Sequence, residues 1–140
     1  MIVGPGDQAY YSALASGLGL SGRVIFSGPQ KESWRYYAAS DIFILPTLYE
    51  AFGLSILEAM AFGLPVVVSG AAGAAELIKD GVNGLLLDDP TDVSEMAAKL
   101  EPLLADASLR RRLGEEAQAT AFQYSWSLAA RRTVDIYKVL

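Results

Sequence analysis

Short apolar runs alternate along the chain with longer segments in which apolar residues recur every three or four positions. The short runs are typical of buried strands, and the longer segments are typical of amphipathic helices. This alternation predicts strand-helix units built on a parallel sheet. The expected strands cover residues 1–3, 23–28, 41–46, 65–70 and 83–89, and the segments expected to be helical are 7–19, 31–40, the loop and helix of 49–61, and 73–81.

Two of these strands carry more specific expectations. The continuous apolar run "DIFILP" (41–46) is typical of a strand covered on both faces. The run "PVVVSG" (65–70) predicts another buried strand, in which Pro65 fits only as the first residue. In the helical segment that follows, Gly81 is the expected stop.

Beyond Pro90 the pattern is helical only. Thr91 and Asp92 are expected to cap a helix that runs through Leu104, and a second helix is expected over 106–123. The last helix should begin near Ser125 or Ser127, with one apolar stripe formed by Trp126, Ala130, Val134 and Tyr137. The chain therefore predicts a single α/β domain over residues 1–140, with a helical C-terminal tail.

Composition narrows the chemistry. The chain has 140 residues, is 52% hydrophobic, and has no uncharged run near the roughly 20 residues that span a bilayer. It has no Cys, which fits a cytoplasmic location, and its first residues do not resemble a signal peptide. It also has no His, so the commonest general base near neutral pH and the commonest metal ligand are both absent. A net charge of -5 with scattered basic residues argues against nucleic acid as a partner.

Four loops are the candidate ligand-binding segments. In open parallel sheets, ligands bind in the loops that follow the carboxyl ends of the strands. The first loop, "GPGD", is interpreted as a tight turn, because Ala9 leaves the G-x-G-x-x-G pattern incomplete. The loop "SGAAGAAE" fits an anion site and close helix packing equally well. The four loops cover residues 4–7, 27–30, 46–53 and 69–76.

Basic residues near these loops are interpreted as solvated charges rather than phosphate ligands. Lys31, Arg35 and Lys79 lie in polar helical segments, and the run "RRR" (110–112) is expected on an exposed helix face. Anion binding is therefore expected from backbone amides.

The stretch "YEAFGLSILEAMA" (49–61) places two glutamates in an otherwise apolar segment. For Glu58 a structural interpretation exists, because "SILE" matches a capping box in which the glutamate bonds the amide of Ser55. Alternatively, a helix starting near Gly53 would let Glu50 and Glu58 both face the cleft, on either side of amides suited to a phosphate. No capping role covers Glu50, so it is the sharper functional candidate. The layout suits a nucleotide sugar, which has hydroxyls at both ends and phosphates between them.

A longer pattern surrounds this stretch. The segments "RVIFSG", "YYAASDIFILPTLYEAFGLSILEAMAFGLPVVVSG", "GAAELI" and "DGVNGLLLDDP" follow one another in this order. They resemble the C-terminal half of the retaining GT-B glycosyltransferases of family 4, also described as glycosyl transferases group 1, and the resemblance covers nearly the whole chain. It implies a Rossmann-like half of a GT-B fold that binds a UDP-, GDP- or ADP-sugar as donor, without a metal or another cofactor.

The resemblance also implies roles for individual residues. Glu50 and Glu58 form the E-x7-E pattern of the family. Glu50, the candidate catalytic residue, would contact hydroxyls of the donor sugar near the reacting centre, and Glu58 would bind the ribose hydroxyls. The loop with Gly28 and Pro29 would lie along the base. The diphosphate and sugar would be held by the turn formed by Phe52, Gly53, Leu54 and Ser55.

The chain departs from the family in what it lacks. Family members carry an earlier strand with an Arg and a Lys that clamp the diphosphate, and a whole acceptor-binding domain at the N-terminus. The chain is therefore expected to be the donor-binding half of a longer parent, inactive alone, with peripheral membrane association of the parent left open. The apolar tail, with Trp126, Tyr137 and Leu140, is expected to pack on the missing half and to promote self-association here.

Two other functions remain as alternatives: a nucleotide-binding or interaction fragment without a transfer role, and a sugar epimerase on the same scaffold. The base, the sugar and the acceptor do not follow from the sequence.

Overall fold

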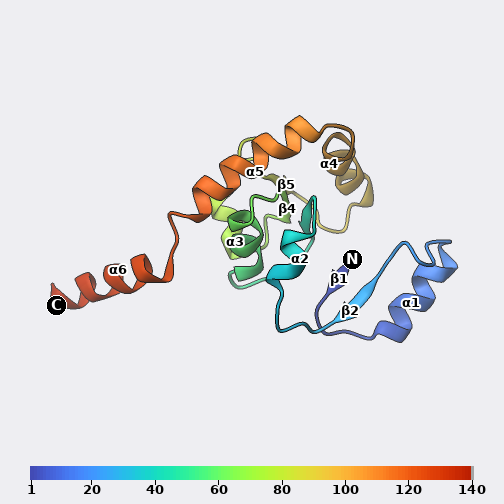
Figure 1. The fold of residues 1–140 in the computed structure, drawn as a ribbon, viewed down its shortest axis with the longest axis horizontal. Helices are drawn as coiled ribbons and strands as arrows, with labels where there is room; N and C mark the ends of the chain where they lie inside the picture. Colours follow the sequence, from blue (N-terminus) through green and yellow to red (C-terminus); the bar gives the residue numbers. More distant parts are fainter. Residues whose placement is uncertain (140) are drawn as a thin grey trace. The chain divides into compact units, whose positions relative to one another are not determined.

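The computed structural model describes residues 1–139 and divides into two compact units, Met1–Tyr36 and Tyr37–Leu140, with Leu140 itself outside the described residues. Strands and helices alternate before helices alone complete the chain, which confirms the predicted α/β class with a helical tail (Figure 1). That one domain takes in residues 1–140 stays a prediction. The elements are β1 (Ile2–Val3), α1 (Gln8–Gly17), β2 (Phe26–Gly28), α2 (Trp34–Ala38), β3 (Phe43–Leu45), α3 (Leu54–Ala61), β4 (Val66–Ser69), η1 (Gly73–Leu77), β5 (Leu85–Leu87), α4 (Val93–Ala105), α5 (Ala107–Ala121) and α6 (Trp126–Lys138).

In the first unit, β1 and β2 pair in parallel, and α1 connects them along the chain. The carboxylate of Asp7 caps α1 by accepting a hydrogen bond of 3.0 Å from the amide of Tyr10. Both strands are short, and β2 begins later than the apolar run predicts. The unit is thus one strand-helix-strand element, and the predicted ligand loops 4–7 and 27–30 lie at the carboxyl ends of its two strands.

In the second unit, three parallel strands form a sheet in the order β3-β4-β5. The central strand β4 is buried along its whole length, as its valines predict. Full coverage of β3 is wrong for Ile44, which stays 39% exposed because β3 lies at an edge of this sheet. Pro65 precedes β4 instead of beginning it, and its carbonyl oxygen accepts the amide hydrogen bond of Phe43, 3.0 Å long.

Successive residues of β4 face two hydrophobic clusters. Val66 and Val68 belong to the cluster formed with α3 and α5, whereas Val67 packs with Leu87, Leu103 and residues of α4 and α5. Side chains of a strand alternate between its faces, so this division means that helices cover the sheet on both sides. The core therefore lies around β4.

The helix expected over 73–81 is instead the short 3-10 helix η1, which ends at Leu77. Asn83 explains this early end, because its side chain accepts the amide hydrogen bond of Lys79 (2.7 Å) and donates to the carbonyl of Leu77 (3.0 Å). Gly81 lies in the turn beyond, with φ of 75°, and is not the residue that stops the helix.

Three side-chain caps begin the C-terminal helices. Asp92 caps α4, as predicted, and Asp106 and Ser125 cap α5 and α6. The exposed-face interpretation of the arginine run is wrong for Arg110, which is half-buried and donates to the carbonyl of Leu103 at 2.7 Å, near the end of α4. Arg110 of this run therefore satisfies a backbone carbonyl near the C-terminal end of α4.

Candidate functional site

The loops after β3 and β4, two of the predicted ligand loops, lie side by side in the second unit. The amide of Gly73 donates to the carbonyl oxygen of Glu50 at 3.0 Å, and the amide of Ala74 donates to that of Phe52 at 2.6 Å. Glu50 and Ala72 also form an isolated parallel bridge. These bonds fix the first glutamate at the carboxyl edge of the sheet, where ligands of parallel sheets bind.

Gly53 is the N-cap residue of α3, which confirms the helix start expected near this glycine. Its backbone is left-handed, with φ of 92°, and its carbonyl oxygen accepts the amide hydrogen bond of Ile56 at 2.9 Å. A side chain here would be strained, and its Cβ would lie 2.9 Å from the Cδ1 atom of Ile56. The amides of Leu54 and Ser55 belong to the first turn, which has no acceptor within the helix and is therefore suited to an anion.

The capping-box interpretation of Glu58 is wrong. Because Gly53 is the N-cap residue, Ser55 lies inside the helix, and no side chain caps its start. The Oε2 atom of Glu58 instead accepts a hydrogen bond of 2.9 Å from the hydroxyl of Tyr37. Glu58 is otherwise exposed, so its carboxylate stays available to a ligand.

Tyr37 is a residue of the candidate site that was not expected from the sequence. It lies on α2, it is half-buried, and its ring lies 6.0 Å from that of Phe43 and 5.8 Å from that of Phe62. Burial, and then the hydrogen bond to Glu58 and its negative charge, raise the pKa of Tyr37 above its usual range. The phenol therefore stays protonated and donates. Its place in the quoted family segment was the available signal, but the partner lies 21 residues away.

Glu50 is half-buried and lies beside the start of α3. Its Oε1 atom accepts a long hydrogen bond of 3.4 Å from the amide of Phe52. A Cβ added at Gly53 would lie 3.3 Å from the Cγ atom of Glu50, so the side chain runs along the helix start. The structure thus brings Glu50 to the predicted anion-binding end of α3.

A cavity of about 590 Å³ opens between α3 and the start of α6, and it brings three predicted donor residues together. Phe52, Leu54 and Glu58 line it, with Trp126 and Arg132 from α6. Arg132 could not be recognised from the sequence, because its helical spacing resembles that of any solvated charge. The cavity combines apolar walls with a carboxylate and a guanidinium, a lining suited to a ligand with polar groups.

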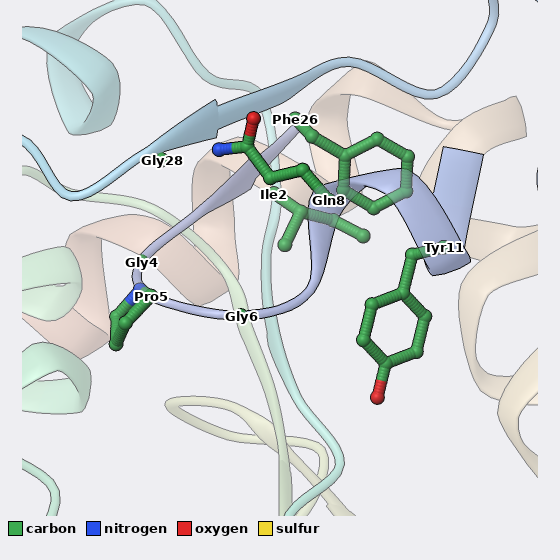
Figure 2. Close-up of a pocket in the computed structure, with 8 residues that line it drawn as sticks. All are labelled: Ile2, Gly4, Pro5, Gly6, Gln8, Tyr11, Phe26 and Gly28. Atoms are coloured by element: carbon green, nitrogen blue, oxygen red, sulfur yellow. The ribbon is translucent and has the colours of Figure 1, made fainter.

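In the first unit, Gly28 lines a second pocket of about 260 Å³ together with the "GPG" turn (Figure 2). Figure 2 shows Gln8 between this turn and β2, and its Nε2 atom would lie 2.7 Å from a Cβ at position 28. The "GPGD" turn is therefore part of a hollow as well as a tight turn. Pro29 follows in the same loop but does not line the pocket. That this loop joins Glu50 and Glu58 in one site stays a prediction.

Among residues 1–139, no cluster of three or more acidic side chains could hold a metal ion. Over the same described range, no helix is long and apolar enough to cross a bilayer.

Comparison with known proteins identifies the family. Residues 1–120 match the family model described as glycosyl transferases group 1. An uncharacterized glycosyltransferase of Methanocaldococcus jannaschii is 35% identical over 99% of this chain and 36% of its own length. The lipopolysaccharide core biosynthesis glycosyltransferase LpsE of Rhizobium meliloti is 41% identical over 76% of this chain and 31% of its own length.

Solved structures of glycosyltransferases are also similar to this chain. HepE of Anabaena in complex with UDP has a TM-score of 0.89 and 33% identity over 99% of this chain and 40% of that one. The same protein was also solved in complex with UDP-glucose. Parallel strands flanked by helices and a helical tail are thus the architecture of GT-B glycosyltransferases. The chain spans about a third of the length of the curated relatives it matches, 36% and 31%. It belongs to the glycosyl transferases group 1 family.

Proposed function

We propose that this chain is the donor-binding domain of a retaining GT-B glycosyltransferase of family 4, which moves a sugar from a nucleotide sugar to an acceptor. The main support is the arrangement around α3. Glu50 lies beside the helix start, the first-turn amides follow it, and Glu58 projects from the same helix with an exposed carboxylate. The UDP and UDP-glucose complexes of HepE agree with a nucleotide-sugar donor.

Each group has a part in this proposal. The carboxylate of Glu58 accepts hydrogen bonds from the ribose hydroxyls, and Glu50 contacts hydroxyls of the transferred sugar near the reacting centre. Amides at Gly53, Leu54 and Ser55 bind the diphosphate, and as the leaving group departs they stabilise its developing charge. Hydrogen-bond donors of the protein can stabilise the charge on the leaving diphosphate without a metal ion.

The rest of the enzyme is part of the proposal as well. Because the chain matches about a third of its relatives' length, we propose that a longer protein supplies the acceptor domain. The donor-binding domain alone is then expected to bind a nucleotide sugar without transferring the sugar. Base, sugar and acceptor are properties of that complete enzyme and its loops.

Replacing Glu58 by alanine should weaken nucleotide binding by about tenfold or more, because hydrogen bonds to a charged group contribute roughly 1.5–3 kcal/mol. The measurement is calorimetric titration with UDP, GDP, ADP and their sugars. Glu115→Ala is the matched control, since it removes the same charge from an exposed site on α5. Unchanged affinity in Glu58→Ala would refute the ribose assignment, and no heat with any of the ligands would refute the donor-binding function.

The exposed apolar stripe of α6 supports the proposal that this chain self-associates. Trp126, Val134 and Tyr137 are 79%, 50% and 73% exposed, and Leu140, the last residue named in the apolar tail, lies outside the described residues. Light scattering should find a mass above that of the monomer as concentration rises, because association removes apolar surface from water. Trp126→Ala should shift the mass back toward the monomer. A wild-type monomer at every concentration would contradict the proposal.

A further inference from the structure

Binding a ligand through Glu58 has a cost in side-chain conformational entropy. It is an exposed glutamate on a helix surface, and a free glutamate side chain loses up to about 2 kcal/mol of conformational entropy when a ligand fixes it. A group that fixes the carboxylate beforehand would remove part of that cost from binding. The hydroxyl of Tyr37 makes such a contact, 2.9 Å from the Oε2 atom of Glu58.

Tyr37 is itself well anchored. Its ring contacts those of Phe43 and Phe62, at centroid distances of 6.0 and 5.8 Å, and packs against the core cluster around α3. The phenol is a rigid donor with few rotatable bonds, unlike the glutamate that it meets. The hydrogen bond from the fixed Tyr37 hydroxyl therefore sets the position of the flexible Glu58 carboxylate.

We propose that Tyr37 is a positioning residue for Glu58, holding one carboxylate oxygen so that the other meets the ribose hydroxyls of a nucleoside diphosphate. This inference rests on the proposed function. A carboxylate accepts about four hydrogen bonds, so the phenol and two ribose hydroxyls can share it. Tyr37 touches no part of the ligand and acts only through Glu58.

A purely structural role is the competing explanation, because the same bond ties α2 to α3. The two roles differ in which ligands they affect. Positioning of Glu58 matters only to a ligand that has ribose hydroxyls, whereas a loosened fold would weaken every nucleotide alike. A 2′,3′-dideoxynucleoside diphosphate lacks both hydroxyls and separates the two explanations.

The test titrates the tightest-binding of UDP, GDP and ADP, and its 2′,3′-dideoxy form, into four proteins: wild type, Tyr37→Phe, Glu58→Gln and the double variant. Tyr37→Phe removes the hydroxyl and keeps the packed ring. It should weaken binding of the ribose form about three- to tenfold, the net value of one hydrogen bond, and leave the dideoxy form unchanged. When Tyr37→Phe is added to Glu58→Gln, it should cause no comparable further loss of affinity for the ribose form. A fifth protein, Tyr10→Phe, removes an exposed phenol hydroxyl on α1 and is the control.

The outcomes separate this inference from the proposed function. If Glu58→Gln weakens binding and Tyr37→Phe does not, the inference is wrong and the donor-binding function stands. Equal losses for ribose and dideoxy forms, or a Tyr37→Phe protein that does not fold, assign the bond to stability and overturn the inference. If no nucleotide binds the wild type, the proposed function fails and the inference with it. If Glu58→Gln binds as the wild type does, the ribose assignment of Glu58 fails and the inference with it, while the donor-binding function stands.

Discussion

Replacing Gly114 by alanine should destabilise the second unit by about 3 kcal/mol, the upper end of the usual cost of overpacking. Gly114 is buried inside α5, where the helix packs closely on the end of α3. A Cβ atom here would overlap the carbonyl oxygen of Gly63 and lie 3.0 Å from its carbonyl carbon and 3.6 Å from the nitrogen of Pro65. All three are backbone atoms, so no side chain can rotate away, and α5 must shift from the core.

Urea unfolding followed by far-UV circular dichroism measures this effect. Gly17→Ala is the matched control, because Gly17 is also a helical glycine but a Cβ there would meet nothing within 4 Å. Alanine at position 17 should leave stability unchanged or raise it by up to about 1 kcal/mol through its better helix propensity. Equal unfolding midpoints for Gly114→Ala and wild type would show that α5 does not pack on Gly63 as described.

Features that depend on neighbouring residues could be predicted from the sequence. The valine run before Ser69 predicted the central buried strand, and Asp92 predicted the start of α4. Gly53 was expected near the start of α3, and its left-handed backbone explains why only a glycine fits there well. The candidate site was found for the same reason, since Glu50 and Glu58 lie on one continuous loop and helix.

Features that depend on a side chain outside the local pattern could not be predicted. The capping box of Glu58 was a sound local pattern, but Tyr37, which approaches from α2, determines where this carboxylate bonds. Asn83 shortens η1 by taking up its backbone groups, and Arg110 bonds the end of α4 instead of facing water. In each case a side chain outside the local pattern, 21, 6 or 7 residues away along the chain, makes the hydrogen bond that overrides what the local sequence favours.

Replacing Gly73 by alanine should combine a loss of stability with a loss of donor binding. Its Cβ would overlap the carbonyl oxygen of Ala51 and lie 3.1 Å from the Cα atom of Phe52. The backbone between Glu50 and Phe52 must then move, although the Gly73 amide bonds the carbonyl of Glu50. We expect a cost of about 2 kcal/mol in urea unfolding and an affinity for the preferred nucleoside diphosphate sugar reduced about tenfold.

Gly70→Ala is the control, because it stiffens the same loop without displacing the backbone between Glu50 and Phe52. Gly70 lies exposed in the same loop, and a Cβ there would make an ordinary contact of 3.8 Å with the carbonyl oxygen of Leu87. It should therefore change stability by less than about 0.5 kcal/mol and leave donor affinity intact. If Gly73→Ala loses stability but binds the donor like the wild type, the position of the Glu50 segment does not govern binding. The catalytic assignment of Glu50 would then lose its structural basis, whereas the assignment of Glu58, which lies on the helix and not on the displaced loop, would be unaffected.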